Sequence, residues 1–358
     1  MSTDGHLVVA WPGRKRHRAE MHRRRGTIET AATLFAHFGG SVFTLAEAEK
    51  AGVSARRLGL ATEAGFVLRL RRGLYRVADA HMFGDVRTVD PGVAQMEIAG
   101  HLVGEFRERG VDAAVGDETA ASAWGLPHTG LTVPTIRVPR GSTTRRGTRH
   151  GVRVREGDTD DVVTFRGQFI TSPLATARDI CRELPRHQAV GLFGLAQRRL
   201  AEWLIAGDER MDPGDLTSAL TDADLRAQLG AEMRRMLADS TRRQHWCDSA
   251  DPRPETYLEG ISWGRLTSWR LGAMTPQAWV RGASGRSYRV DVLIDGVAGE
   301  ADGAVKYATR DALWKEKLRQ EDIENGGTPV VRWTFAEAEH RPHVLLARWR
   351  NALGRLAA

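Results

Sequence analysis

The sequence is poor in cysteine and has no long apolar run. Cys181 and Cys247 are its only cysteines, and neither belongs to a CxxC or Cys/His pattern. This excludes a disulfide framework and a cysteine-based zinc site, and it favours idle thiols in a reducing cytoplasm. No stretch of 18 apolar residues occurs, so no membrane span is predicted. Basic residues near the N-terminus lack a following apolar segment, which argues against a secretory signal.

The positive charge is concentrated toward the N-terminus. A chain of 358 residues with 41% hydrophobic and 27% charged residues is typical of a globular protein of two or three domains. The net charge is +7: residues 1–26 carry seven Lys/Arg against two acids, residues 27–77 carry seven against four, and the remainder is close to neutral. Clustered cations neutralise phosphates, so we expect double-stranded DNA to bind at this end.

Residues 1–26 contain the basic runs RKRHR and HRRR without a hydrophobic period. We expect a disordered basic arm, which either grips phosphates or is a solvated tail. Met21 is an alternative start of the chain, and starting there would remove most of the arm.

Residues 27–82 predict the element order of a winged helix. TIETAATLFAHF has helical apolar spacing with Thr27 as N-cap, and VFT predicts a short strand. LAEAEKAGVSARRLGLATEAGF predicts helix, turn and helix, because Gly52 ends the first helix and Ser54 caps the second. FVLRLRRGLYRVA predicts a hairpin around Gly73. In a winged helix the second helix of the turn enters the major groove and the hairpin contacts the DNA backbone.

Arginines occupy the positions that these tasks require. Arg56 and Arg57 lie in the first turn of the predicted recognition helix, where base edges are within reach. The hairpin adds four cations that would meet phosphates: Arg69, Arg71, Arg72 and Arg76. The alternative is a helical hairpin that contacts another protein, with the arginines merely solvated.

Residues 83–245 predict a mixed α+β domain. IRVPRG and GVRVRE have strand character, whereas TSPLATARDICRELP and HQAVGLFGLAQRRLAEWL are amphipathic helices. Thr171 or Ser172 before Pro173 matches an N-cap followed by proline in the first helical position.

Residues 250–358 predict an α/β domain with a cluster of charged residues. In VDVLIDGVAGEADGAVKY, strand periodicity places Glu300 and Asp302 on one face, and a hairpin turn brings Asp291 alongside. Asp291, Glu300 and Asp302 would hold Mg²⁺ for phosphodiester hydrolysis, and Lys306 would stabilise the transition state. The alternative is that these charges are solvated at a sheet edge. However, burying an Asp inside an apolar run costs free energy, so such an Asp is expected to have a specific role. Upstream, Glu255 and Glu259 are expected on one face of a helix.

The N-terminal motifs resemble a known family. VFTLAEAEKAGVSARRLGLATEAGFVLRLRRGLYRV is similar to the winged helix of the AbiEi antitoxins of type IV toxin–antitoxin systems, and ASAWGLPHTG, IRVPRG and FITSPLATARDICRELP extend the likeness to about residue 205. The resemblance implies a DNA-binding regulator that represses its own operon and opposes a nucleotidyltransferase-like toxin. A neutralising role of the middle domain is a further idea.

The C-terminal part resembles the Vsr-like branch of the PD-(D/E)XK nucleases. The matched residues are RVD with Asp291, GEADG with Glu300, and VKY with Lys306. Glu259 best matches the helical glutamate that opens the fold, and Glu255 is the alternative. The E-x-K of that superfamily is here Glu300-Ala301-Asp302, so lysine is missing from its usual place. The resemblance therefore implies a restriction-endonuclease-like α/β fold, in which a migrated Lys306 supports Mg²⁺-dependent cleavage or the domain is a retired nuclease that only binds.

Two functions follow from the sequence. The first is a cytoplasmic DNA-binding regulator with a structural or partner-binding C-terminal domain. The alternative is a Mg²⁺-dependent DNA endonuclease that its winged helix directs to DNA.

Overall fold

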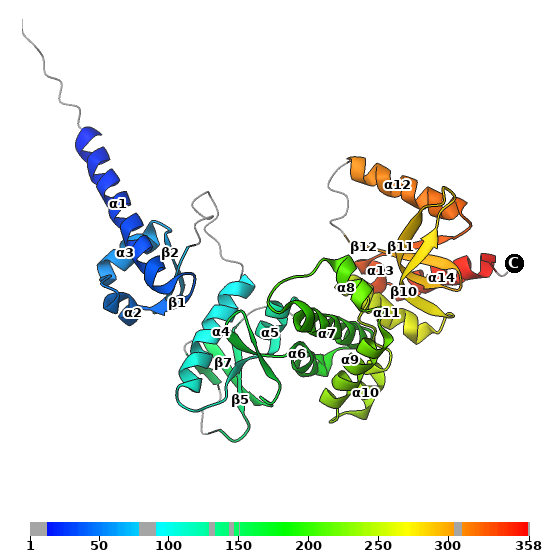
Figure 1. Cartoon of the computed structure of the whole chain (residues 1–358), viewed down its shortest axis with the longest axis horizontal. Coiled ribbons are helices and arrows are strands. Elements are labelled where there is room, and N and C mark those ends of the chain that lie inside the picture. Colours follow the sequence, from blue (N-terminus) through cyan, green and yellow to red (C-terminus); the bar gives the residue numbers. More distant parts are fainter. Residues whose placement is uncertain are drawn as a thin grey trace, which may run out of the picture.

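The computed structural model describes residues 13–78, 91–128, 133–142, 147–149, 151–303 and 310–356. These residues form a mixed α/β structure with a three-stranded, a six-stranded and a four-stranded sheet. Figure 1 follows the chain from the N-terminal unit, in blue, through the six-stranded sheet and its helices to the C-terminal region, in yellow to red. No described helix has the length and apolarity that crossing a bilayer requires.

The N-terminal unit consists of three helices and a small sheet with strand order β1-β3-β2. A capping box between Thr44 and Glu47 starts α2, and the side chain of Ser54 accepts the backbone N–H of Arg57 at the start of α3. Leu58 and Ala61 are buried, so the face of α3 that carries them packs against the core. The elements are α1 (Gly13–Phe38), β1 (Val42–Thr44), α2 (Leu45–Lys50), α3 (Ala55–Glu63), β2 (Val67–Arg71) and β3 (Leu74–Val77).

The helix α1 begins well before the residue expected from the sequence. It starts at Gly13, and Thr27 is a buried residue inside the helix instead of its N-cap. From residue 13 onward, the expectation of a disordered arm is therefore wrong. Arg, Lys, Glu, Met and Ala all have high helix propensity, so a helix anchored by its C-terminal half continues through this segment without apolar periodicity.

The middle region packs helices around a mixed six-stranded sheet with strand order β6-β7-β5-β4-β9-β8. Ser172 caps α6 with Pro173 in the first turn, as expected from the sequence. The strands are β4 (Ala114–Val115), β5 (Thr135–Pro139), β6 (Gly147–Arg149), β7 (Val152–Gly157), β8 (Val162–Phe165) and β9 (Gln168–Thr171). The helices are α4 (Pro91–Arg107), α5 (Asp117–Trp124), α6 (Pro173–Ile180), α7 (Arg186–Ala206), α8 (Pro213–Ala219), α9 (Ala223–Met236) and α10 (Thr241–Cys247), and a 3₁₀ turn spans Cys181–Glu183.

The sheet of the N-terminal unit shares a core with the middle region. Leu74 of β3 belongs to the same buried cluster as Leu102 and Phe106 of α4, and Val42 and Leu70 pack against it. One face of the small sheet is thereby covered by α4. This contact decides which arginines of the hairpin stay exposed.

The C-terminal region has a four-stranded sheet with strand order β10-β11-β12-β13. The first three strands are antiparallel neighbours, whereas β12 and β13 are parallel and α12 connects them. One face packs against α11 and α14, and Ile323 of α12 packs on the other. The elements are α11 (Tyr257–Trp269), β10 (Met274–Arg281), β11 (Ser287–Ile294), β12 (Val297–Asp302), α12 (Arg310–Asn325), β13 (Val330–Thr334), α13 (Phe335–Glu339) and α14 (Pro342–Leu356).

Two glycines allow α7 and α11 to cross at close range. A Cβ atom on Gly191 would lie 2.6 Å from the carbonyl carbon of Gly260, which is closer than any real contact. Arg186 of α7 also donates a hydrogen bond to the carbonyl oxygen of Gly264. The crossing joins the middle region to the C-terminal sheet through backbone contact, so a larger side chain at either position would push the two helices apart.

Candidate DNA-binding surface and carboxylate cluster

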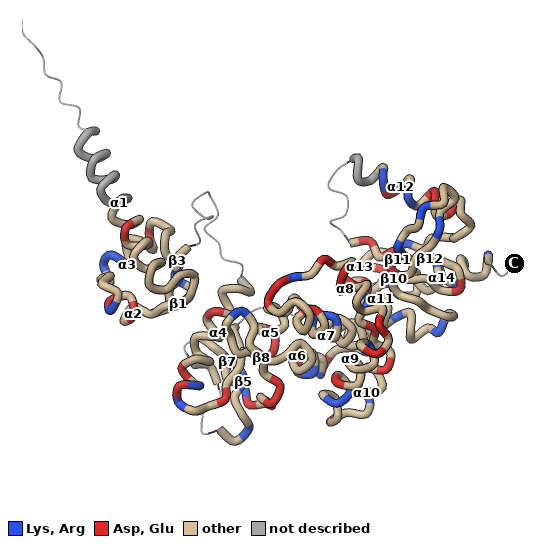
Figure 2. Tube along the Cα trace, in the orientation of Figure 1, with Lys and Arg blue, Asp and Glu red and all other residues tan. Residues whose placement is uncertain are grey.

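The first turn of α3 places two arginines at the surface. Because Leu58 and Ala61 face the core, Arg56 and Arg57 lie on the outer side of the helix, and both are exposed. Figure 2 marks basic residues in blue along the α3 segment of the N-terminal unit. Nε of Arg57 donates a hydrogen bond of 3.2 Å to the hydroxyl of Thr30 in α1. Arg57 therefore braces α3 against α1, whereas Arg56 is free of that restraint.

The four hairpin arginines fall into two classes. Arg69 and Arg72 are exposed. Arg76 forms a 3.2 Å ion pair with Glu97 of α4 and donates to the carbonyl oxygen of Gly40. Burial lowers the pKa of Arg71, and the nearby Glu105 of α4 acts in the opposite direction.

An irregularity in the hairpin separates these two classes. The pairing of β2 with β3 shifts register between Arg69 and Arg71, so side chains two residues apart do not share one environment. Strict alternation would have put both on the same side of the strand. Two of the four expected phosphate contacts, Arg69 and Arg72, face solvent, and the other two face α4.

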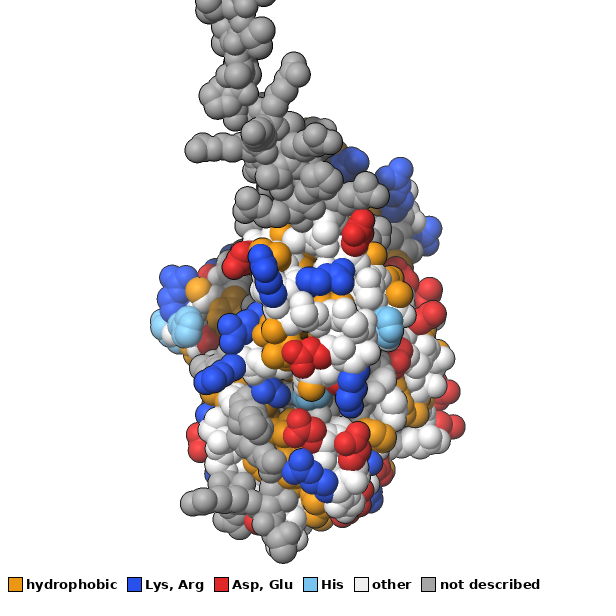
Figure 3. Space-filling model, turned by 90° about the vertical axis from the view of Figure 1, so that its left-hand side faces the viewer, with side chains coloured by type: hydrophobic (Ala, Val, Ile, Leu, Met, Phe, Trp, Pro, Cys, Tyr) orange, Lys and Arg blue, Asp and Glu red, His pale blue; other side chains and the backbone are white. Residues whose placement is uncertain are grey.

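Figure 3 shows the molecule from the side of the N-terminal unit. Lys and Arg side chains on this face alternate with acidic and apolar ones, so the described surface carries dispersed cations instead of one continuous basic patch. DNA recognition by such a surface would depend on a few well-placed arginines more than on bulk charge.

In the C-terminal region, Asp291 lies on β11 directly before the residues that pair with β12. The pairing of these strands runs from Val292 with Gly299 to Ile294 with Val297. The carboxylate of Asp291 accepts the backbone N–H of Ala301 at 2.7 Å. Opposite Asp291 on β10, Gln277 has a φ of 52°, a left-handed conformation that is strained for glutamine. Its side-chain amide donates a 2.8 Å hydrogen bond to Glu259.

Glu259 lies next to Asp291 at the start of α11. Both side chains line a small cavity, together with Trp263 and Trp333. Burial, followed by the charge of Asp291, raises the pKa of Glu259 to about 7. Two carboxylates that share a low-dielectric site cannot both ionise cheaply, so Glu259 is partly protonated near neutral pH.

Glu255 does not share a helix face with Glu259, contrary to expectation. The helix begins at Tyr257 with Thr256 as N-cap, so Glu255 precedes it. Glu259 accepts the backbone N–H of Glu255 at 2.8 Å, and its own N–H donates to Thr256. The sequence T-Y-L-E carries this capping pattern, a signal that was missed. Glu255 pairs instead with Arg289 at 3.0 Å and Arg198 at 3.6 Å.

Two arginines neutralise the carboxylates of β12. Glu300 is buried and forms a 2.8 Å ion pair with Arg319 of α12. Asp302 receives two hydrogen bonds from Arg332 of β13, at 2.9 and 2.6 Å. The parallel pairing of β12 with β13 and the crossover helix α12 bring these partners together. Sequence reasoning did not foresee either arginine, because each is distant along the chain.

The carboxylates of Glu259 and Asp291 lie next to each other, whereas those of Glu300 and Asp302 are in ion pairs with arginines. Among the described residues, no three His, Cys, Asp or Glu side chains are grouped to hold a metal ion. Lys306 lies outside the described residues. The pair Glu259 and Asp291 has the donors that Mg²⁺ uses when substrate phosphates and water complete its coordination. Glu300 and Asp302 are engaged with guanidinium groups, which fits a structural role better.

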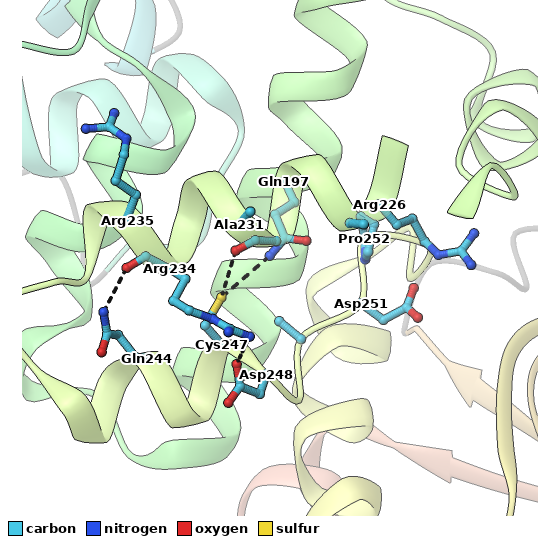
Figure 4. A pocket seen from close by; sticks show the side chains of 13 residues that line it. Gln197, Arg226, Ala231, Arg234, Arg235, Gln244, Cys247, Asp248, Asp251 and Pro252 are labelled. Carbon is cyan, nitrogen blue, oxygen red and sulfur yellow. Dashed lines mark hydrogen bonds and ion pairs between the residues drawn. The ribbon is translucent and has the colours of Figure 1, made fainter. Parts of the chain in front are cut away.

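A larger cavity of about 620 Å³ lies between α7, α9 and α10 (Figure 4). Some of its polar groups bind one another: Arg234 pairs with Asp248, and the side-chain amide of Gln244 donates to the carbonyl oxygen of Arg234 at 3.2 Å (Figure 4). Burial raises the pKa of Cys247 to about 12, so its thiol stays protonated and unreactive. The contacts of Gln197 with Cys247 and of Gln244 with Arg234 join α7, α9 and α10, so they indicate packing between helices.

The N-terminal part of the chain matches the model of one known protein family. Residues 31–78 match the model of the family described as "Transcriptional regulator, AbiEi antitoxin". The matched segment contains β1, α2, α3 and the β2–β3 hairpin, which supports the expected resemblance in this part of the chain. The search of curated proteins found no match.

One similar solved structure is the crystal structure of the RV2827C protein from Mycobacterium tuberculosis. It is 16% identical over 67% of this chain and 81% of that chain, with a TM-score of 0.30. A TM-score of 0.30 is too low to support an inference about the fold of this chain.

Proposed function

We propose that this chain is a cytoplasmic DNA-binding transcriptional regulator that resembles the AbiEi antitoxins and represses its own operon. The observation that carries the proposal is the placement of Arg56 on the outer face of α3, inside the segment that matches the regulator family. The order helix, strand, helix, turn, helix and hairpin supports a winged-helix interpretation.

In this proposal α3 enters the major groove and the hairpin lies over the backbone. Arg56 contacts a base edge, and Arg69 and Arg72 contact phosphates. Arg57, Arg71 and Arg76 instead hold parts of the chain together, because Arg57 binds Thr30 and the other two face α4. This division narrows the six arginines expected from sequence to three that face DNA.

The test measures binding of the full chain to duplex DNA from upstream of its own gene. Arg56→Ala should weaken specific binding by about 1–3 kcal/mol while affinity for random duplex changes little. Arg235→Ala is the matched control, because Arg235 is an exposed arginine on α9 that pairs only locally with Glu232. Equal affinity of wild type and Arg56→Ala for the upstream DNA would remove Arg56 from recognition.

The proposed partner is a toxin, as the family description of an antitoxin implies. The resemblance of the N-terminal motifs to the AbiEi antitoxins leads us to propose that this toxin is nucleotidyltransferase-like. Co-expression with such a toxin from the neighbouring reading frame should restore growth. A deletion of residues 83–205 that still neutralises the toxin would exclude the middle domain from this task.

A Mg²⁺-dependent DNA endonuclease is the second candidate. It is favoured by the Glu259 and Asp291 pair and by the strained Gln277 beside it. The order helix, three strands, helix and strand also agrees with the nuclease-like fold that the resemblance implies. Glu300 and Asp302 are already paired with arginines, which argues against nuclease activity. We therefore propose that this domain binds without cleaving.

Cleavage assays separate the two functions. We expect no Mg²⁺- or Mn²⁺-dependent nicking of duplex, single-stranded or mismatched DNA, with operator binding intact. Cutting that disappears in both Asp291→Ala and Glu300→Ala would instead make the chain a nuclease.

A further inference from the structure

The side chain of Trp279 is unusually exposed for an indole. It is 68% exposed, more than any other large apolar side chain in the described part of the chain. Its neighbours Ala278 and Val280 are buried in the cluster under α12, so strand alternation directs Trp279 to the opposite side of the sheet. A single exposed apolar residue is common and needs no explanation by itself. The residues around Trp279 indicate that it binds a ligand.

Arginines flank Trp279 on the same side of the sheet. Arg289 is its direct cross-strand partner on β11, and Arg281 follows two residues later on β10 and is exposed. Glu255 holds the guanidinium of Arg289 through a 3.0 Å ion pair. An open aromatic ring beside the exposed guanidinium of Arg281, with Arg289 held in place by Glu255, has the composition of surfaces that stack bases and bind an adjoining phosphate.

The position in the sheet leaves this surface accessible. β10 is an edge strand of the four-stranded sheet, so no further strand of the described chain covers its outer side. The hairpin beyond Arg281 is short and polar, with the sequence G-A-S-G-R at residues 282–286. An extended chain with regularly spaced bases and phosphates fits along such an edge.

We propose that Trp279, Arg281 and Arg289 form a platform that stacks an unpaired base of single-stranded nucleic acid. A paired base offers its ring face only at a duplex end, whereas an unpaired one is free to stack on the indole. The cross-strand and next-but-one neighbours of Trp279 are arginine and glutamine, so the indole stands among polar side chains and not in a broad apolar patch. This surface lies on the C-terminal sheet, away from α3, and it acts independently of operator recognition.

The test is fluorescence anisotropy of a labelled deoxythymidine 12-mer with the full chain, in EDTA so that no metal-dependent cleavage interferes. Trp279→Ala should weaken binding about 5- to 150-fold, because stacking of one base contributes that range. Trp279→Phe should retain most of the affinity, since phenylalanine keeps a stacking face. Arg281→Ala should weaken binding and make it less salt-dependent.

Trp314→Ala is the matched control. Trp314 is also an exposed tryptophan, at 59%, but it lies on α12 and outside the proposed platform. A 12-mer with abasic sites keeps the phosphates and removes the bases, so Trp279→Ala should have little effect on its binding. The upstream duplex should bind wild type and Trp279→Ala equally, which keeps this test separate from that of the regulator.

Three outcomes would overturn the platform. They are unchanged 12-mer affinity of Trp279→Ala, an equal loss in Trp314→Ala, and an equal effect of Trp279→Ala on the abasic strand. Thermal unfolding of each variant shows whether a loss arises from misfolding, and at an exposed position we expect the midpoint to stay unchanged.

Discussion

Charged motif residues have opposite environments at the two ends of this chain. In the N-terminal unit Arg56, Arg69 and Arg72 face solvent, whereas in the C-terminal sheet Glu300 and Asp302 lie in ion pairs with arginines of the same chain. An exposed charge can exchange its water for a ligand. A charge already paired inside a fold gives up that pair first, so it is better suited to hold strands together.

The same contrast recurs within the hairpin itself. Arg72 and Arg76 belong to one short motif, RRGLYR, yet the first is exposed and the second pairs with Glu97 of α4. A motif match therefore identifies the unit without assigning a role to each of its residues. The following predictions test that division, from the largest expected effect to the smallest.

The largest effect is expected from Arg319→Met. It leaves Glu300 buried without its guanidinium partner, which should lower the free energy of unfolding by about 3–5 kcal/mol. Urea unfolding followed by tryptophan fluorescence measures this loss. The double variant Arg319→Met/Glu300→Leu should recover much of it, because no unpaired charge is left. A single variant as stable as wild type would mean that the pair is not structural.

Glu259→Gln should change the pH dependence of stability. Burial and Asp291 raise the pKa of Glu259 to about 7 from an ordinary value of 4.5. Between these values the folded state keeps a proton that the unfolded state has released, so wild-type stability falls as pH rises, by about 1.4 kcal/mol per pH unit. The glutamine variant lacks this slope and should exceed wild type most above pH 7. Parallel curves from pH 5 to 8 would contradict the raised pKa.

Arg72→Ala and Arg76→Ala should differ in their effect on DNA binding. Arg72→Ala removes a phosphate contact and should reduce the slope of log affinity against log salt by about 1. Arg76→Ala should keep the salt slope but loosen the N-terminal unit from α4, costing about 1 kcal/mol of stability. Salt titrations and thermal unfolding measure both variants. Identical salt slopes would remove the distinction between these two arginines.

An effect of similar size on stability is expected from Arg57→Ala. The lost hydrogen bond to Thr30 should cost about 0.5–1.5 kcal/mol of stability, and operator affinity should fall less than in Arg56→Ala. Thr30→Val removes the same contact from the other side together with the hydrogen bond from Thr30 to the carbonyl oxygen of Gly26, so it should lower stability at least as much. A larger affinity loss for Arg57→Ala than for Arg56→Ala would reverse their assigned roles.

Several local features were predictable from the sequence because nearby residues determine them. Gly52 and Gly73 adopt left-handed φ values of 80° and 79° at the two predicted turns, and Ser54 and Ser172 cap the helices that follow them. Asp291 was recognised as unusual because it interrupts an apolar strand. Glycine conformation and capping act over about four residues, so one sequence is sufficient to read them.

Only the tertiary structure decided which charged side chains stay free. Arg76 meets Glu97, Glu300 meets Arg319, and Asp302 meets Arg332 across separations that no local pattern encodes. The covering of the small sheet by α4 and the crossover through α12 create these pairs. The sequence by itself thus determined the elements, their caps and the candidate charges. The packing of distant elements determined the use of each charge, because the cost of burying it depends on the partner that the fold supplies.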